Sequence, residues 1–337
     1  MKKLLNVSVT LLVTALIFTG CSKAASSGSG TASPEQKAVT LSLNHVGAAN
    51  HFYHGGALKF AELMKEASGG AVTVDVFPAS QIASGAKAIE FVQMGTLDLA
   101  LESTMALENF VPEAGILNLP FVFKTKKDAF RILDGDIGKE LEKAAEAKGF
   151  KIIAWWDNGF RAISNSSRPV KRPQDVKGLK IRVPESKVFI ETFQILGAVP
   201  TAMAVAEVFS ALQLHTVDGQ ENTLANFINN KYAEVNKFVS DSRHIYTAEP
   251  LIMSLGKFND FPKNIQDALL KAAQKAGEYE RELSLQTDEK DIEAIKAAGV
   301  QVDNLTDINE WIAAVQPVYK SFPQFDSLRQ RIQAEQK

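Results

Sequence analysis

Hydrophobic positions after residue 38 alternate between a period of two and a helical period. Residues 39–44 and 72–76 alternate apolar with polar side chains, as half-buried strands do, and residues 97–101 form a third short apolar run. Residues 54–67 and 86–94 repeat their apolar side chains at helical spacing, and glycines end both segments. This order of strands and helices predicts an open, doubly wound α/β sheet, whose ligands bind beyond the carboxyl ends of the strands.

The pattern continues with less regular connections. Residues 151–156 form a further strand pattern, and Asn158-Gly159 is expected to turn the chain. A strand over residues 250–255 is expected to return to the first domain. Helical patterns are found at residues 188–196, 206–212 and 225–238.

Residues 264–298 carry the longest helical pattern of the chain. Gly277 is the one internal residue that disfavours a helix, and Gly299 supplies the stop. At a rise of 1.5 Å per residue the segment would extend about 50 Å, which exceeds the width of a small domain. The sequence leaves open a kink or a break at residues 286–288.

Two neighbouring segments in the middle of the chain carry candidate ligand-binding chemistry. Residues 179–183 alternate as a strand that Pro184 ends, and Arg182 lies at its carboxyl end. An arginine there can bind a carboxylate through two parallel hydrogen bonds, although the alternation also fits an amphipathic strand with solvated cations. Residues 218–222, with the sequence DGQEN, are expected to form a loop that presents an amide to a ligand.

The KGLKIRVP segment, followed in order by EVF, ALQ and VDGQEN, resembles the solute receptors of tripartite ATP-independent periplasmic (TRAP) transporters, the DctP family. The resemblance extends from about Val39 to the C-terminal region. It implies an α/β, two-domain, periplasmic-binding-protein-like fold with a hinge, in which the long helix spans both domains. The implied boundaries are residues 38–158 with 248–287 for domain I, and residues 159–247 with 288–330 for domain II.

The resemblance also implies a set of ligand-binding residues. Arg182 matches the arginine that binds the ligand carboxylate, Arg161 matches a second arginine near the same group, and Asn222 matches an amide that orients it. Asn44 and Glu102 match groups from the opposite domain that bind hydroxyl or amine groups. Taken singly, Arg161 and Glu102 also fit solvated surface residues. Val205 stands where the family often has an aromatic residue, which removes one expected packing contact.

The charges of this set favour one ligand class. A carboxylate that leaves water needs charged hydrogen-bond partners, which two arginines and an amide supply. Glu102 would repel a second carboxylate and accept hydrogen bonds from hydroxyls, so a sugar acid such as a uronate is favoured over a four-carbon dicarboxylate. Residues 244–254 also resemble the sugar-acid branch of the family. A periplasmic enzyme is the remaining alternative, but the chain has no G-x-S-x-G or H-E-x-x-H motif.

The N-terminus is typical of an exported protein. Residues 1–21 combine a basic start with a short apolar core and end in FTGC, which resembles a lipobox whose Cys21 is lipidated. Phe18 departs from the usual leucine, and a plain cleaved signal is the alternative. Residues 22–37 are rich in Ser, Gly and Ala, as flexible tethers are. We therefore expect a protein of the cell envelope, anchored by lipid to a membrane.

Composition restricts the partners and cofactors. Lys and Arg number 37 against 39 Asp and Glu, so no basic excess exists for nucleic acid. His45, His51 and His54 cluster after the first strand but lack the companion ligands of a metal site, and we expect them near the cleft without a metal. We expect no cofactor, and a monomer whose partners are an organic acid anion and the membrane permease subunits.

Overall fold

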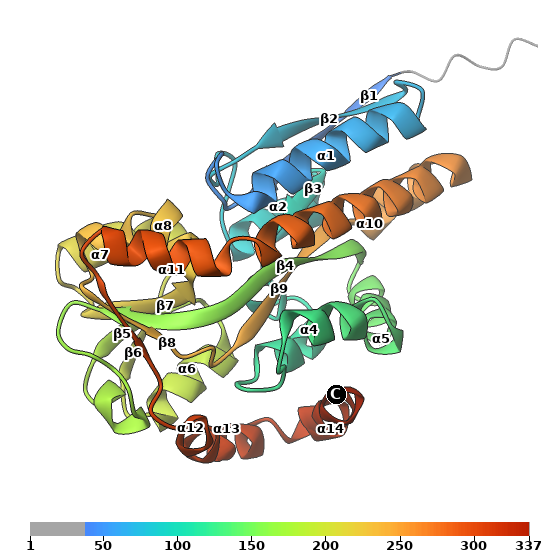
Figure 1. The fold of residues 1–337 in the computed structure, drawn as a ribbon. Helices are drawn as coiled ribbons and strands as arrows, with labels where there is room; N and C mark the ends of the chain where they lie inside the picture. Colours follow the sequence, from blue (N-terminus) through green and yellow to red (C-terminus); the bar gives the residue numbers. More distant parts are fainter. Residues whose placement is uncertain (1–37, 337) are drawn as a thin grey trace, which may run out of the picture. The chain divides into compact units, whose positions relative to one another are not determined.

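The computed structural model describes residues 38–336, through which one mixed sheet runs (Figure 1). Its strands follow the order β2-β1-β3-β9-β4-β7-β5-β6, while β8 pairs with β4 and β10 pairs with β8. The strands are β1 (Val39–His45), β2 (Val72–Phe77), β3 (Leu99–Leu101), β4 (Phe150–Asn165), β5 (Lys180–Val183), β6 (Val199–Ala202), β7 (Gly219–Thr223), β8 (Phe238–Asp241), β9 (Tyr246–Ser254) and β10 (Gln301–Asn304). The predictions for residues 1–37, including the lipidation of Cys21, lie outside the described residues.

Two long strands connect two groups of strands. β1 lies parallel to β2 and β3, β3 pairs antiparallel with β9, and β9 pairs antiparallel with the first part of β4. We call this group the first lobe. The C-terminal part of β4 pairs with β7 and β8, and β5 lies parallel to β6 and β7. This second lobe also contains β10. The arrangement confirms the predicted two-domain α/β fold. The exact boundaries of the two domains stay a prediction.

Helices pack against the strands of both lobes. In the first lobe α1 contacts β2 and α10, while α4 and α5 contact β4. The helices are α1 (Phe52–Ala67), α2 (Ala86–Met94), α3 (Thr104–Leu107), α4 (Lys126–Leu133), α5 (Asp136–Glu146), α6 (Lys187–Ile195), α7 (Val208–Gln213), α8 (Leu224–Asn229), α9 (Leu255–Asp260), α10 (Lys263–Leu285), α11 (Asp288–Ala297), α12 (Ile308–Ala314), α13 (Gln316–Ser321) and α14 (Asp326–Glu335).

The long C-terminal helical segment consists of two helices. α10 lies along α1 and β4, and α11 continues to α8 and β10 of the second lobe (Figure 1). The break at Gln286 and Thr287, which the sequence left open, is therefore present. Lys126 bridges it, because its Nζ donates to the Ser284 hydroxyl at 3.0 Å and to Asp288 at 2.7 Å. The segment joins both lobes, as the resemblance implied.

A β-bulge interrupts β4 between the lobes. Its pairing with β9 shifts between Asp157 and Gly159, and Gly159 has a φ of 110°, which favours glycine. The predicted turn at Asn158-Gly159 is therefore wrong. The chain continues as a strand because β9 pairs with β4 on both sides of the bulge and β7 pairs with β4 beyond it.

Two predictions in the second lobe are also wrong. Residues 218–222 were expected to form a loop, but Gly219–Thr223 is the buried strand β7. The helix expected over residues 225–238 ends at Asn229, and β8 begins at Phe238. Pairing with β4 outweighs the local preferences of these polar segments, which is the usual way in which tertiary contacts override propensity.

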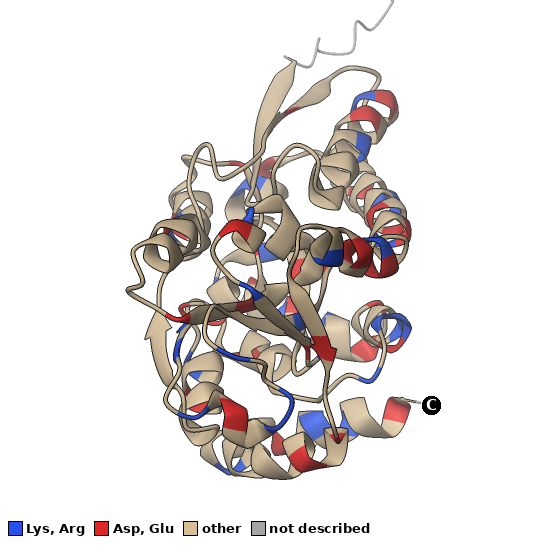
Figure 2. Cartoon of the chain, turned by 60° about the vertical axis from the view of Figure 1, so that its left-hand side comes forward, with Lys and Arg blue, Asp and Glu red and all other residues tan. Residues whose placement is uncertain are grey.

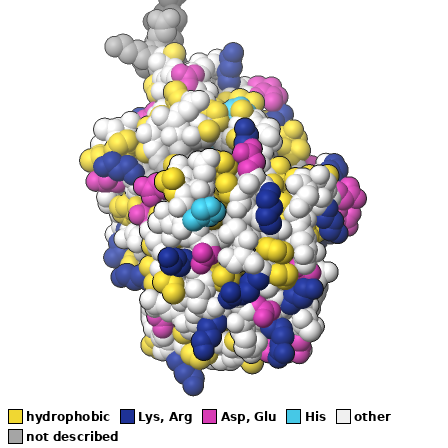
Figure 3. All heavy atoms as spheres, turned by 90° about the vertical axis from the view of Figure 1, so that its left-hand side faces the viewer, with side chains coloured by type: hydrophobic (Ala, Val, Ile, Leu, Met, Phe, Trp, Pro, Cys, Tyr) yellow, Lys and Arg dark blue, Asp and Glu magenta, His cyan; other side chains and the backbone are white. Residues whose placement is uncertain are grey.

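Charged side chains of both signs are interspersed in the two views of Figures 2 and 3. Figure 2 shows Lys and Arg interspersed with Asp and Glu along several helices, and the face in Figure 3 carries the same mixture. This distribution differs from the continuous basic stripe of nucleic-acid-binding proteins. Within residues 38–336, no helix combines the length and the apolar character that a membrane crossing requires.

Candidate ligand-binding site

A cavity of about 70 Å³ lies between the two lobes, with room for several waters or a small polar solute. The first lobe contributes Glu102, and the second contributes Arg161, Arg182 and Asn222. The structure thus brings four of the five predicted site residues to one cavity. Asn158, Asn226 and Glu249 also line it and were not predicted. Val205, the residue that replaces the family's frequent aromatic, is part of the lining.

Arg182 is a buried cation without a carboxylate partner among the described residues. It extends from β5, is 3 % exposed, and donates from Nε and Nη2 to the Met203 carbonyl at 3.1 and 2.7 Å. Burial lowers the pKa of its guanidinium. A buried charge that is paired only with a carbonyl is unfavourable until a counterion arrives, so this geometry suits an incoming anion.

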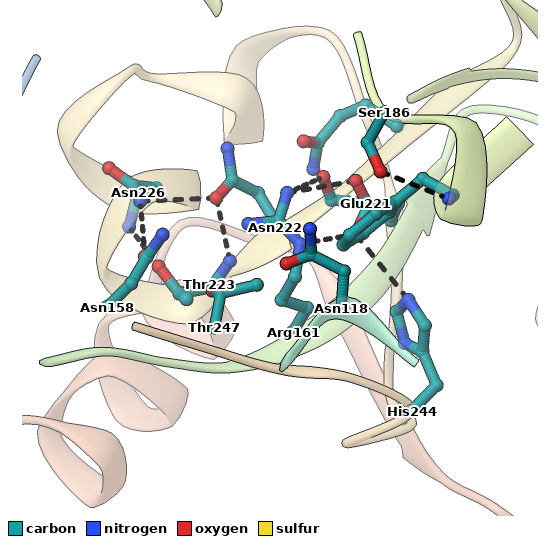
Figure 4. Close-up of polar contacts among 12 residues, drawn as sticks. Asn118, Asn158, Arg161, Ser186, Glu221, Asn222, Thr223, Asn226, His244 and Thr247 are labelled. Carbon is teal, nitrogen blue, oxygen red and sulfur yellow. Dashed lines mark hydrogen bonds and ion pairs between the residues drawn. The ribbon is translucent and has the colours of Figure 1, made fainter. Parts of the chain in front are cut away.

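Arg161, in contrast, is held by Glu221. Its Nε and Nη2 donate to the two carboxylate oxygens at 2.5 and 2.9 Å, and Nη2 also donates to the Glu221 carbonyl at 2.8 Å (Figure 4). His244 Nε2 lies 3.5 Å from the same carboxylate. Burial raises the pKa of Glu221, but Arg161 and then His244 outweigh burial and leave the pKa below its ordinary value. Arg161 Nη1 has no protein acceptor among residues 38–336, so it remains available to a ligand.

Three asparagines form a chain beside the arginines. Asn222 Oδ1 accepts from the Thr223 amide at 2.9 Å and from Asn226 Nδ2 at 3.1 Å, and Asn226 Nδ2 also donates to Asn158 Oδ1 at 3.3 Å (Figure 4). These hydrogen bonds fix the orientation of the Asn222 side-chain amide, because its Oδ1 already accepts two of them. Its Nδ2 has no acceptor among the described residues and is therefore free to donate to a ligand oxygen.

Two acidic side chains form another part of the lining. Glu102 Oε2 accepts from the Gly85 amide at 3.2 Å, while its Oε1 and both oxygens of Glu249 have no hydrogen-bond partner within residues 38–336. Burial, and then Glu249, raise the pKa of Glu102 well above its ordinary value. Burial raises the pKa of Glu249 to about 8. No sequence signal pointed to Glu249, which directly precedes the strand expected over residues 250–255.

Asn44 lies outside this lining. Its Nδ2 donates to the Ala83 carbonyl at 2.8 Å and its Oδ1 accepts from the Ile82 amide at 3.1 Å. Both ends of the amide are therefore bound within the protein. The side chain supports the segment that precedes Ser84 and Gly85, which do line the cavity. The expected ligand contact of Asn44 therefore stays a prediction.

The three N-terminal histidines also lie away from the cavity lining. His45 Nε2 and His54 Nδ1 are 3.1 Å apart, and His51 Nδ1 accepts from the Tyr53 amide at 3.2 Å. Burial lowers the pKa of both His45 and His51 to about 3. Among the residues that the structure describes, no group of His, Cys, Asp and Glu side chains is arranged to bind a metal.

Comparison with known proteins places the chain in a family. The family model described as bacterial extracellular solute-binding protein, family 7 (DctP) matches residues 43–324. The chain belongs to this family, so it is an extracytoplasmic solute receptor of the TRAP class and not an enzyme. The predicted receptor class is confirmed. Receptors of this class bind small organic acids and work with membrane permease subunits.

Solved structures of TRAP periplasmic solute-binding proteins share the fold. The protein from Polaromonas sp. JS666, bound to D-erythronate, is 35 % identical with a TM-score of 0.85, over 88 % of this chain and 98 % of that one. The protein from Roseobacter denitrificans, with β-D-glucuronate, is 33 % identical with a TM-score of 0.85, over 88 % and 99 %. The protein from Sulfurospirillum deleyianum, with succinate, is 32 % identical with a TM-score of 0.83, over 88 % and 99 %.

Proposed function

We propose that this receptor captures a hydroxylated monocarboxylate, such as a uronate or another sugar acid, and delivers it to its permease. The observation that carries the proposal is the separation of donors and acceptors in the cavity. Arg182, Arg161 Nη1 and Asn222 Nδ2 offer donors to a carboxylate. Glu102 and Glu249 offer unpartnered carboxyl oxygens to hydroxyl groups.

A dicarboxylate fits this separation of hydrogen-bond donors and acceptors less well. Its second carboxylate would place a third acid beside Glu102 and Glu249 in a poorly hydrated cavity, where each negative charge opposes the ionisation of its neighbours. The D-erythronate and glucuronate that relatives bind are hydroxylated monoacids, which supports the proposal. Because another relative binds succinate, four-carbon dicarboxylates remain the competing ligand class.

Ligand binding would close the two lobes around the cavity. The connections between the lobes are β4 with its bulge, β9, and the α10–α11 break. Bulges and helix ends are places where a few dihedral angles can absorb a rotation between domains. In this proposal domain I comprises residues 38–158 with 248–287, and domain II comprises residues 159–247 with 288–330.

The position of the receptor in the envelope is a further part of the proposal. Lipidation of Cys21 would anchor the chain to a membrane, with residues 22–37 as a tether and the receptor acting as a monomer. The FTGC ending of the apolar N-terminal segment supports the anchor.

A thermal-shift screen of the purified protein tests the ligand class. A ligand that binds only the folded state at a hundredfold excess over its Kd stabilises that state by about 2.7 kcal/mol. We expect D-glucuronate, D-galacturonate or D-erythronate to raise Tm, and succinate and malate to have little effect. Stabilisation by the dicarboxylates alone would contradict the proposal.

A further inference from the structure

Asn226 lies at the centre of the chain of asparagines beside the arginines (Figure 4). Its Nδ2 donates to Asn222 Oδ1 at 3.1 Å and to Asn158 Oδ1 at 3.3 Å. The side chain lines the cavity, and the residue is 7 % exposed. Its two acceptors belong to different strands, β7 and β4. Because an amide nitrogen carries two hydrogens, both donors of Asn226 are used within the protein.

Backbone contacts hold Asn226 in this position. Its amide donates to the Thr223 hydroxyl at 3.3 Å, and its carbonyl accepts from Asn230 Nδ2 at 2.9 Å. Thr223 is the N-cap of α8, so the first of these hydrogen bonds belongs to the cap of that helix. The backbone on both sides of the Asn226 side chain is thus bound without a ligand, which restricts where its Nδ2 can lie.

The orientation of the Asn222 amide depends on this donor. A side-chain amide presents an acceptor at one end and donors at the other, and a half turn exchanges the two ends. The Thr223 amide, at 2.9 Å, and Asn226 Nδ2 both donate to Asn222 Oδ1. The opposite orientation would place Asn222 Nδ2 against two donors. Asn222 is only 5 % exposed, and donors left without acceptors in a buried place are costly.

We propose that Asn226 is a positioning residue for the ligand carboxylate, which acts by holding the Asn222 amide with Nδ2 directed at the anion. This inference rests on the proposed function, because it takes Asn222 Nδ2 as a donor to the ligand. A carboxylate only accepts hydrogen bonds, so an Asn222 amide in the opposite orientation would turn its oxygen toward another acceptor. Through Asn226, Asn222 joins Arg182 and Arg161 Nη1 as a donor to the anion.

The contribution of Asn226 is pre-organisation of Asn222. Without Asn226 Nδ2, only the Thr223 amide holds Asn222 Oδ1, and the side chain must be ordered when the ligand binds. Ordering one side chain on binding weakens affinity by about twofold to tenfold. Asn222→Ala should weaken binding by about tenfold or more, because it removes a hydrogen bond to a charged group.

A double-mutant cycle, measured by calorimetry with D-glucuronate and D-erythronate, tests the inference. The four proteins are the wild type, Asn222→Ala, Asn226→Ala and the double variant. Asn226→Ala should weaken binding by about twofold to tenfold in the wild-type background. The same substitution should have no further effect in the Asn222→Ala background, because Asn226 acts through Asn222. Damage to α8 unrelated to Asn222 would instead weaken binding equally in both backgrounds.

Asn229→Ala is the matched control. It removes another asparagine of α8, whose Nδ2 donates to the Ala225 carbonyl at 2.8 Å and which does not line the cavity. This variant should keep the wild-type affinity. Melting temperatures of the ligand-free variants show whether each substitution leaves the fold intact.

Asn226→Asp gives a second result that does not depend on the double variant. The introduced carboxylate has nearly the same shape but only accepts hydrogen bonds, so it attracts Asn222 Nδ2 and turns it away from the ligand. We expect this variant to bind at least tenfold more weakly than the wild type and more weakly than Asn226→Ala. Wild-type affinity in Asn226→Asp would overturn the inference, also where Asn222→Ala binds too weakly to complete the cycle.

The outcomes separate the two proposals. If Asn226→Ala binds like the wild type, or weakens binding equally in both backgrounds, the positioning role is wrong and the ligand class stands. An Asn222→Ala variant with full affinity also overturns it, because Asn226 would then have no ligand contact to position. If the wild type binds succinate and neither hydroxy acid, the proposed ligand class is wrong, and the same cycle with succinate decides the positioning role separately.

Discussion

Arg161 and Glu221 form a buried two-point ion pair, with Nε and Nη2 at 2.5 and 2.9 Å from the two carboxylate oxygens. Arg182, which lines the same cavity, has no such partner in the described part of the chain. The two arginines are therefore not equivalent. Glu221 compensates the charge of Arg161 and orients its Nη1, whereas the charge of Arg182 remains for the ligand.

Neutralising Glu221 should destabilise the fold. Glu221→Gln leaves the Arg161 cation buried without its counterion, and breaking a buried pair in this way typically costs about 3–5 kcal/mol. Chemical denaturation of the ligand-free protein measures the effect. Glu310→Gln, which removes the partner of the exposed Arg172, serves as control and should change stability far less, because exposed ion pairs contribute little. Equal effects of the two substitutions would contradict the role of the pair.

Gly159 should be required for the bulge in β4. A side chain at its φ of 110° is strained, and an added Cβ would lie 3.4 Å from Lys126 Cε. We expect Gly159→Ala to lower the free energy of unfolding by about 1–3 kcal/mol. Gly256→Ala, in a helix where the nearest atom is 3.7 Å away, should be neutral or slightly stabilising. A neutral Gly159→Ala, measured by denaturation, would show that the bulge tolerates a side chain.

The sequence predicted the elements whose periodicity is local. Five elements lie close to their expected positions, namely β1, α1, β2, α2 and β5. The long helical pattern corresponds to α10 and α11. The sequence did not predict β7, because Gln220, Glu221 and Asn222 read as a polar loop. These side chains are buried in a strand only because β4, which lies far away in the sequence, pairs with them and supplies Arg161.

The candidate site was predictable to a similar degree. Arg182 follows from strand alternation, and family motifs added Arg161, Asn222 and Glu102. A motif also does not reveal that the Asn44 amide binds residues 82 and 83 through both of its ends, which only the structure shows. Glu249 could not be assigned, because its exposure to the cavity depends on how β9 pairs with β4 and β3.

Glu249 should make stability depend on pH. Its pKa rises from 4.5 to about 8 in the folded protein, so its contribution is complete below pH 4.5 and is lost as the pH rises to about 8. Glu249→Gln removes this titration. The free energy of unfolding of the variant, relative to that of the wild type, should therefore increase between about pH 5 and about pH 8. Denaturation of the ligand-free proteins at both values measures it, and a constant difference would exclude the raised pKa.

Cys21 should determine whether the protein remains on a membrane. Cys21→Ser removes the only cysteine of the chain and with it the proposed lipidation site. We expect the variant to be released from the membrane fraction or to remain unprocessed. Mass spectrometry of the wild type should find a lipid on Cys21. A soluble, unmodified wild type would contradict the anchor and leave the receptor assignment unchanged.

The anion contact at Arg182 is the basis of the proposed binding mode. Arg182→Ala removes the one buried cation of the cavity that lacks a carboxylate partner in the described chain. Arg182→Lys keeps a charge but cannot reproduce the planar fork that binds both carboxylate oxygens. Arg172→Ala, an exposed arginine outside the cavity, is the matched control.

Calorimetric titration of these four proteins with D-glucuronate and D-erythronate tests the account most directly. The wild type and Arg172→Ala should bind at least one of the acids with equal affinity. Arg182→Ala should lose about 2–5 kcal/mol of binding free energy, at least roughly thirtyfold in Kd, and Arg182→Lys should bind much more weakly than the wild type. Unchanged melting temperatures without ligand would show that the fold is intact. Full affinity in Arg182→Ala would contradict the account, because the ligand carboxylate would then bind elsewhere.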